Sequence, residues 1–150
     1  MTKIMFVCFG NICRSPMAEF VMKHLVRKAG LEKNFLIESA GCYPSVGTPV
    51  AEGTVRELRK HAVEFTRRTS KRLLDRDYPR FDYIVGMDRS NVRSMEELFG
   101  GDPDKKIFLL MDFAGEHRDV DDPWYTEDYA TTYRDVLTGC EALLEKISRA

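Results

Sequence analysis

Residues 4–15 read Ile-Met-Phe-Val-Cys-Phe-Gly-Asn-Ile-Cys-Arg-Ser, and their pattern predicts both a fold and a chemistry. The apolar run 4–7 is typical of a strand that is buried on both faces. Cys8 ends this run, a short loop follows, and Arg14-Ser15-Pro16 opens an amphipathic segment. We therefore predict a cysteine at the carboxyl end of a buried strand, just before the start of a helix.

The loop between this strand and this helix has the features of an anion site. The free N–H groups of the loop and of the first helical turn point inward, and the helix dipole favours negative charge there. The same field stabilises a thiolate, so Cys8 is predicted to be a nucleophile. Arg14 adds a fork of donors that suits two oxygens of a phosphate-like dianion. The combination predicts phosphoryl transfer through cysteine.

Apolar segments and helical patterns alternate along the rest of the chain. The alternation predicts a parallel sheet with helices on both faces, and such sheets bind ligands at the carboxyl ends of their strands, where Cys8 lies. The predicted strands after the first are 35–37, 83–85 and 107–111. The predicted helices are marked by Met17, Phe20, Val21 and Leu25, by Val55, Leu58 and Ala62, and by an apolar stripe from Tyr133 to Ile147.

The spacing of Cys8 and Arg14, with five residues between them and Ser15 next, resembles the signature of the cysteine-dependent phosphatases. The stretch lies at the start of the chain and also contains Asn11, Cys13 and Pro16. In these features it resembles the low-molecular-weight protein tyrosine phosphatases. The resemblance implies a three-layer α/β fold with four parallel strands, in a single phosphatase domain over residues 1–150. It also implies hydrolysis of phosphotyrosine and small aryl phosphates through a phosphocysteine, without metal or cofactor.

A phosphate ester needs a proton on its leaving oxygen, and a positioned carboxylic acid supplies it. Asp122 is the candidate, because Pro123 restricts it to extended conformations and so aims its side chain. Trp124 and Tyr125 complete an Asp-Pro-aromatic-aromatic stretch, which resembles the loop that carries the family's general acid. Asp121 is interpreted as a residue next to the acid and not as the acid itself. The alternative is an ordinary acidic turn with a core tryptophan.

The resemblance assigns roles to further residues. It implies that Asn11 braces the loop and that Ser15 donates to the Cys8 sulfur. Cys13 lies in the same short loop as Cys8, so we expect the two to form a redox pair. The segments Ser39-Ala40-Gly41 and Met87–Asn91 match the family more loosely. The predicted phosphate-binding residues are Phe9, Gly10, Asn11, Ile12, Cys13, Arg14 and Ser15, and the predicted substrate pocket comprises Ile12, Tyr43, Trp124 and Tyr125.

The chain departs from the family at two positions. Tyr43 stands where a tryptophan is frequent, and Arg68 aligns with a histidine that braces the phosphate loop in the family. These departures leave substrate preference and loop stabilisation open.

Composition and charge limit the possible binding partners and the cellular compartment of the protein. The net charge of −1 argues against a general nucleic-acid binder, and no apolar run approaches the ~20 residues of a membrane span. The chain shows no signal-peptide pattern and only four cysteines, so we expect a cytoplasmic monomer whose partners are phosphotyrosine proteins and a tyrosine kinase. A basic stretch at 56–80 and an acidic one at 112–128 are either solvated faces or a device that steers acidic phosphopeptides.

We expect no metal or thiol chemistry at the histidines or at the two remaining cysteines. His24, His61 and His117 lack metal-ligand spacing, and His24 is expected on a partly buried helix face. Cys140 belongs to the apolar stripe of the last helix, and Cys42 is expected in a loop.

Four other functions fit parts of this pattern. Thioredoxin-coupled arsenate reductases share this loop, but they need two further cysteines close in sequence, and none occurs between Cys42 and Cys140. Protein-arginine phosphatases carry threonine where this chain has Ile12. A cysteine-phosphorylated carrier does not need Arg14 or a general acid, and a non-catalytic phosphotyrosine-binding module does not need Cys8 or Asp122. The presence of all three residues favours turnover.

Overall fold

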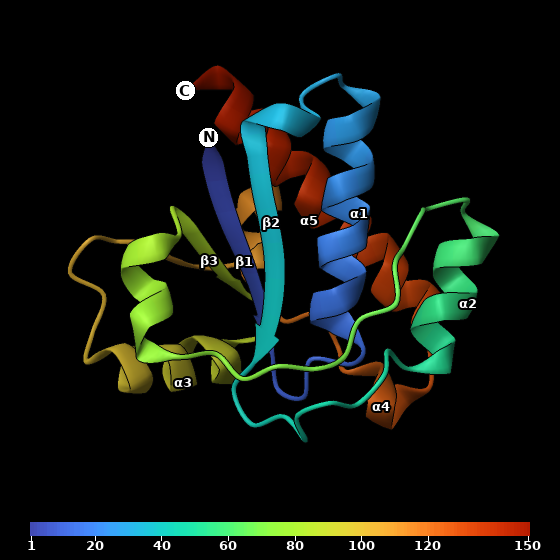
Figure 1. Ribbon diagram of the computed structural model, residues 1–150, viewed down its shortest axis with the longest axis horizontal. Coiled ribbons are helices and arrows are strands. Elements are labelled where there is room, and N and C mark those ends of the chain that lie inside the picture. Colours follow the sequence, from blue (N-terminus) through green and yellow to red (C-terminus); the bar gives the residue numbers. More distant parts are fainter.

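A four-stranded, all-parallel sheet with the order β2-β1-β3-β4 forms the centre of the molecule. The computed structural model describes residues 1–150. It places helices on both faces of the sheet, as predicted (Figure 1). The strands are β1 Thr2–Cys8, β2 Phe35–Gly41, β3 Tyr83–Gly86 and β4 Ile107–Leu109, and the α-helices are α1 Arg14–Lys28, α2 Glu52–Lys60, α3 Arg89–Phe99, α4 Pro123–Thr126 and α5 Tyr129–Arg149. Short 3-10 helices are η1 Glu32–Asn34, η2 Asp75–Arg80 and η3 Leu110–Ala114.

Side chains on the two faces of β1 pack into two separate apolar cores, which explains why residues 4–8 of the strand are all apolar. Ile4, Phe6 and Cys8 point into a core of 21 buried residues shared with α1 and α5. Met5 and Val7 point into a smaller core of 7 buried residues on the other face. Successive strand residues alternate between faces, so a central strand covered on both sides has no polar face.

The structure corrects several predicted boundaries. The second strand continues to Gly41, and the fourth ends at Leu109 because the buried Leu110 and Met111 lie in η3. The second helix ends at Lys60, and Ala62 lies beyond it with a φ of 55°. Helix α3, which was not predicted, begins at a capping box formed by Asp88 and Asn91.

The side-chain predictions outside the site are confirmed. Cys140 is fully buried in the large core, Cys42 lies in the loop after β2, and His24 is half-buried on α1. None of the helices combines the length and the apolar content that a membrane span needs.

Helix α5 packs closely on η3 through a glycine, and this contact gives a stability prediction. A Cβ added at Gly139 would lie 2.5 Å from Leu110 Cγ, a distance that forces one of the elements to move. Gly139→Ala is therefore expected to lower the free energy of unfolding by about 1–3 kcal/mol, although alanine is the better helix former. Urea unfolding measures this. The exposed neighbour serves as control, since Thr138→Ala should be neutral or slightly stabilising.

Candidate active site

The phosphate loop, defined here as residues 8–15, lies at the carboxyl end of β1 and leads into α1. The predicted strand-loop-helix junction is confirmed. The Cys8 sulfur is 2.9 Å from Ser15 Oγ and accepts the Asn11 backbone N–H at 3.3 Å. Since Ser15 Oγ accepts a hydrogen bond from Asn11 Nδ2 at 2.8 Å, the hydroxyl proton is free to point at the sulfur. Two donors are thus directed at Cys8, an arrangement that suits a thiolate.

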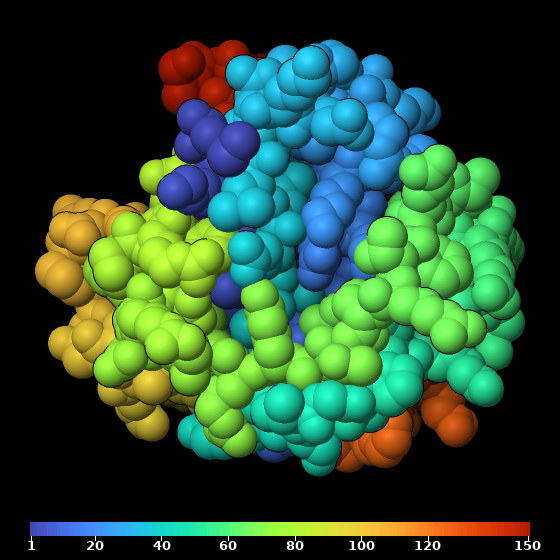
Figure 2. All heavy atoms as spheres, viewed as in Figure 1, coloured from blue at the N-terminus to red at the C-terminus, as the bar shows by residue number.

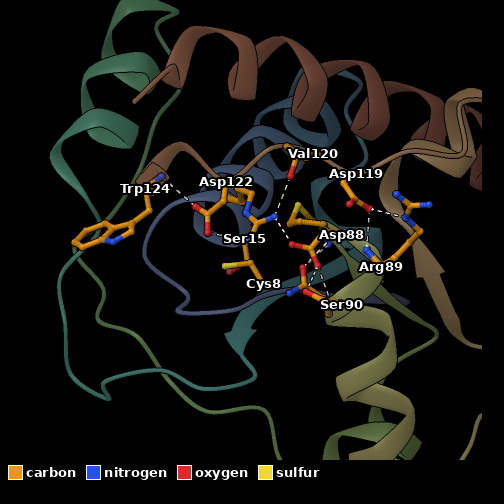
Figure 3. Close-up of polar contacts among 12 residues, drawn as sticks. Cys8, Ser15, Asp88, Arg89, Ser90, Asp119, Val120, Asp122 and Trp124 are labelled. Carbon is orange, nitrogen blue, oxygen red and sulfur yellow. Dashed lines mark hydrogen bonds and ion pairs between the residues drawn. The ribbon is translucent and has the colours of Figure 1, made fainter. Parts of the chain in front are cut away.

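Arg14 is 2% exposed and its guanidinium is held from three sides. Nη1 donates to Asp88 Oδ2 at 2.7 Å and to the Val120 carbonyl at 2.9 Å, while Nη2 donates to Asp122 Oδ2 at 3.3 Å. Figure 3 shows Asp88, Val120 and Asp122 around this group, beside Cys8. Burial alone would lower the pKa of Arg14, but the charges of Cys8, Asp88 and Asp122 raise it. The cation is therefore permanent.

Asp88 orients the guanidinium, and sequence reasoning did not single it out. Its Oδ1 accepts from Ser90 Oγ at 2.6 Å and from the Asn91 N–H at 2.8 Å, which leaves Oδ2 for Arg14. Burial by itself raises the pKa of Asp88, but the hydrogen bonds from Ser90 and Arg14 outweigh it and hold the pKa below its usual value. The position of Asp88 in the sequence could have indicated this role, because Asp88 follows β3, which pairs with β1.

Asp122 comes from the far end of the chain and faces the phosphate loop. It has an extended backbone before Pro123 and caps α4, with Oδ1 accepting the Trp124 N–H at 3.0 Å. Trp124 is 63% exposed, so the alternative of a core tryptophan is wrong. The indole extends outward from the turn that carries Asp122 (Figure 3). The segment before it contacts α3 through an exposed ion pair, in which Arg89 Nε donates to Asp119 Oδ1 at 3.1 Å.

A cavity of about 350 Å³ opens over Cys8 and Arg14. It is lined by every predicted site residue except Asn11 and Ser15, two loop residues that are fully buried. Ser45 and Thr48, which were not predicted, line it as well. The Phe9 and Tyr43 rings pack with centroids 5.4 Å apart, and Trp124 and Tyr125 also line the cavity. Phe9 was predicted only as a phosphate-binding residue, but its ring is 55% exposed and lies at the cavity as well.

Cys13 lines the same cavity as Cys8 but has a different environment. Its thiol is buried and lies 3.6 Å from the hydroxyl of Tyr129, at the start of α5. Burial raises the pKa of Cys13 to about 11, although the hydrogen bond with Tyr129 lowers it in part; the charge of Cys8 adds a smaller rise. Cys13 is therefore a neutral thiol at physiological pH, whereas a nucleophilic cysteine reacts as the thiolate.

The comparisons with known proteins cover almost the whole chain. The family described as "Low molecular weight phosphotyrosine protein phosphatase" matches residues 3–150. The chain is 37% identical over 152 residues to "Low molecular weight protein-tyrosine-phosphatase YfkJ" of Bacillus subtilis, covering 99% of this chain and 97% of the relative. The crystal structure of YfkJ superposes with a TM-score of 0.96, at 37% identity and with 99% and 96% of the two chains covered.

Two further solved structures are similar. A low molecular weight protein tyrosine phosphatase from Streptococcus pyogenes has a TM-score of 0.87 at 40% identity, with 97% of this chain and 93% of the other covered. A structure described as "YwlE arginine phosphatase" has a TM-score of 0.89 at 27% identity, with 98% and 96% covered.

Proposed function

The chain belongs to the low molecular weight protein tyrosine phosphatase family, and on that premise we propose that it hydrolyses phosphotyrosine through a phosphocysteine on Cys8. One observation carries the proposal: Cys8 and Arg14 of the phosphate loop border the same cavity as Asp122, which lies 108 residues beyond Arg14 in the sequence. Residues 1–150 act in this proposal as one catalytic unit.

In the first step the Cys8 thiolate attacks phosphorus, and the bond to the tyrosine oxygen breaks. Asp122 delivers a proton to that oxygen, so tyrosine leaves neutral. Arg14 and the N–H groups of residues 9–14 bind the non-bridging oxygens as the charge redistributes. The incoming phosphate replaces Asp122 as a partner of Arg14 Nη2, which frees the carboxyl group to face the leaving oxygen.

In the second step water attacks the phosphocysteine, with Asp122 now acting as the base. The sulfur leaves as a thiolate, and the Ser15 hydroxyl and the Asn11 N–H are already placed to stabilise it. The residues of the site thus serve both steps, and no metal is needed to generate the nucleophile.

The rim of the cavity supports an aromatic phosphate ester as substrate. The phosphate is the same in phosphoserine and phosphotyrosine, so the phosphate loop cannot discriminate between them. The rings of Tyr43, Trp124 and Tyr125 can contact a tyrosine side chain, and each ring pair contributes ~0.5–1.5 kcal/mol beyond burial. Ile12, half-buried and apolar, suits an aryl group better than a charged phosphoguanidinium.

Activity on a matched set of peptides tests the proposed function. Peptides of one sequence carrying phosphotyrosine, phosphoserine or phosphoarginine are compared by kcat/KM. We expect phosphotyrosine to be preferred. A preference for phosphoarginine would instead place this chain with the function named for YwlE, and a preference for phosphoserine would contradict the aromatic pocket.

Asp122→Asn is expected to slow aryl phosphates with poor leaving groups by a factor on the order of 10²–10⁴ and those with good leaving groups much less. The reason is that only a poor leaving group needs the proton. A series of substituted phenyl phosphates measures the dependence. Asp121→Asn, one residue away, is the control and should be mild. Equal slowing across the series would give Asp122 a structural role only.

Cys13 gives the site a redox response in this proposal. Peroxide converts the Cys8 thiolate to a sulfenic acid, and the Cys13 thiol then attacks that sulfur, releasing water and forming a disulfide. We expect peroxide inactivation to be reversed by dithiothreitol in the wild type and to be irreversible in Cys13→Ser. Cys42→Ser is the control and should behave as wild type. Mass spectrometry that finds sulfinic Cys8 and no disulfide in the wild type contradicts this role.

We further propose that the protein is cytoplasmic and works as a monomer opposite a tyrosine kinase. All four cysteines are free, which supports a reducing compartment. Light scattering of the purified protein tests the monomer, and a stable dimer would contradict it.

A further inference from the structure

A tyrosine hydroxyl from the last helix contacts the second cysteine of the phosphate loop. Tyr129 is the first residue of α5 and is half-buried. Its hydroxyl oxygen lies 3.6 Å from Cys13 Sγ, which is within hydrogen-bond distance for sulfur. Helix α2 packs on α5, and Figure 2 shows the neighbouring α4 turn (orange) beside the segment that leads into α2 (blue-green). The contact therefore lies where the phosphate loop, α2 and α5 come together.

The ring of Tyr129 is held in place by its surroundings. A Cβ added at Gly53 of α2 would lie 2.3 Å from Tyr129 Cε1, so the ring rests directly on the α2 backbone. Asp128 caps the first turn of α5 and so fixes the residue that follows it. Helix α2 is also joined to the loop, because Thr54 Oγ1 donates to the Cys13 carbonyl at 3.0 Å. The hydroxyl is thus kept at the Cys13 sulfur by packing on both sides.

The hydrogen bond has only one possible direction when Cys13 is ionised, because a thiolate can only accept. It lowers the pKa of Cys13 in part, against the larger effect of burial. Burial and the contact with Cys13 both raise the pKa of Tyr129, so the phenol keeps its proton and remains a donor. The other charged groups around this pair are Cys8, Arg14, Arg56 and Asp122.

The redox response proposed above depends on the Cys13 thiolate. Once peroxide has converted Cys8 to the sulfenic acid, this group has two fates. In the first, the Cys13 thiolate forms the S–S bond, the S–O bond of Cys8 breaks, and the hydroxide that leaves takes up a proton to become water. In the second, another peroxide oxidises Cys8 to the sulfinic acid, which dithiothreitol does not reduce. A donor that favours the Cys13 thiolate therefore favours the reversible fate.

We propose that Tyr129 is a positioning residue for the redox response: its hydroxyl donates to Cys13 Sγ, favours the thiolate that attacks sulfenic Cys8, and so protects the nucleophile from irreversible oxidation. The inference rests on the proposed function and on the proposed pairing of Cys8 with Cys13. It gives Tyr129 no part in phosphate ester hydrolysis, in keeping with the position of Tyr129 outside the lining of the cavity.

The test compares Tyr129→Phe with Tyr133→Phe as a matched control. Both variants lose one hydroxyl from α5 and keep the ring, but the ring of Tyr133 stacks on His61, with centroids 3.8 Å apart. Each protein is treated with a series of peroxide concentrations and then with dithiothreitol, and the recovered activity is measured. Mass spectrometry of samples taken before dithiothreitol measures the disulfide between Cys8 and Cys13 and the sulfinic acid of Cys8.

Tyr129→Phe is expected to shift the outcome toward the sulfinic acid. Loss of a hydrogen bond to a charged sulfur should lower the thiolate fraction of Cys13 by a factor on the order of 10. The remaining thiolate is more basic and attacks faster, so disulfide formation should slow by only about threefold. The peroxide concentration that leaves half of the activity unrecoverable should fall by the same factor, whereas Tyr133→Phe should match the wild type. Both variants should keep the kcat and KM of the wild type, which a general distortion of the phosphate loop would alter.

Alkylation gives a second measurement that involves no oxidation. In the Cys8→Ser background, iodoacetamide modification of Cys13 should be slower with Tyr129→Phe than with Tyr133→Phe, because it also requires the thiolate. Thermal unfolding is followed for each variant, and if Tyr129→Phe does not fold, Tyr129→Leu, which also lacks the hydroxyl, decides by the same criteria.

The outcomes separate this inference from the proposals on which it rests. Equal peroxide responses of Tyr129→Phe and Tyr133→Phe, beside a disulfide in the wild type, overturn the role of Tyr129 and leave the redox response standing. Absence of that disulfide from the wild type overturns both. Neither result bears on the phosphatase activity itself, which fails only if Cys8→Ser stays active.

Discussion

Cys8→Ser is expected to lower turnover of aryl phosphates by a factor on the order of 10⁴ or more. A serine hydroxyl is far less ionised than a thiol at neutral pH, so it cannot attack phosphorus at a useful rate. The anion site should survive, because its donors come from the backbone and Arg14. Binding of inorganic phosphate or tungstate, measured by calorimetry, should therefore remain.

The control for this variant is Cys42→Ser, which replaces a half-buried thiol in the loop after β2 and leaves the cavity lining intact. It should keep full activity. Residual activity of Cys8→Ser above a few per cent would mean that another group is the nucleophile. Loss of phosphate binding along with turnover would mean that the substitution had disrupted the loop.

Arg14→Lys is expected to lower kcat by a factor on the order of 10²–10³ although the positive charge is kept. An ammonium group cannot reproduce the fork that now reaches Asp88, Val120 and Asp122, and it cannot bind two phosphate oxygens in one plane. Because this contact strengthens as charge moves onto the phosphate oxygens, kcat should suffer more than KM.

Arg89→Lys is the matched control for this second variant. Arg89 forms an exposed ion pair with Asp119 beside the site, and such pairs contribute about 0–1 kcal/mol. Its kinetics should stay within a few-fold of the wild type. An Arg14→Lys enzyme with a near-normal kcat would rule out the two-pronged clamp.

The fold was predictable because its decisive features are local. The apolar run before Cys8 and the helical spacing after Arg14 placed β1, the phosphate loop and α1 correctly. The place of Asp122 at the site was predicted from the resemblance of residues 122–125 to the family's acid loop, and its backbone before Pro123 is extended as expected. The parallel sheet followed from the alternation of elements, and Cys8 then had to lie at its ligand-binding edge.

Features that depend on packing were not predictable from the sequence. The run through Leu110 and Met111 is as apolar as a strand, but the chain turns there into η3, and burial alone does not distinguish the two. The contact of Asp88 with Arg14 becomes apparent only when β3 is known to lie beside β1. The hydrogen bond from Arg68 to the Asn11 carbonyl, which answers the question of loop stabilisation left open by the sequence, joins residues 57 positions apart.

The central claim is a covalent phosphocysteine on Cys8, and rapid quenching tests it most directly. The enzyme is mixed with a ³²P-labelled aryl phosphate, denatured within milliseconds, digested and analysed by mass spectrometry. The account predicts label on the peptide that contains Cys8, and more of it in Asp122→Asn with a good leaving group, because the loss of the base slows hydrolysis. Turnover without label on any peptide, or label on a residue other than Cys8, would contradict the account.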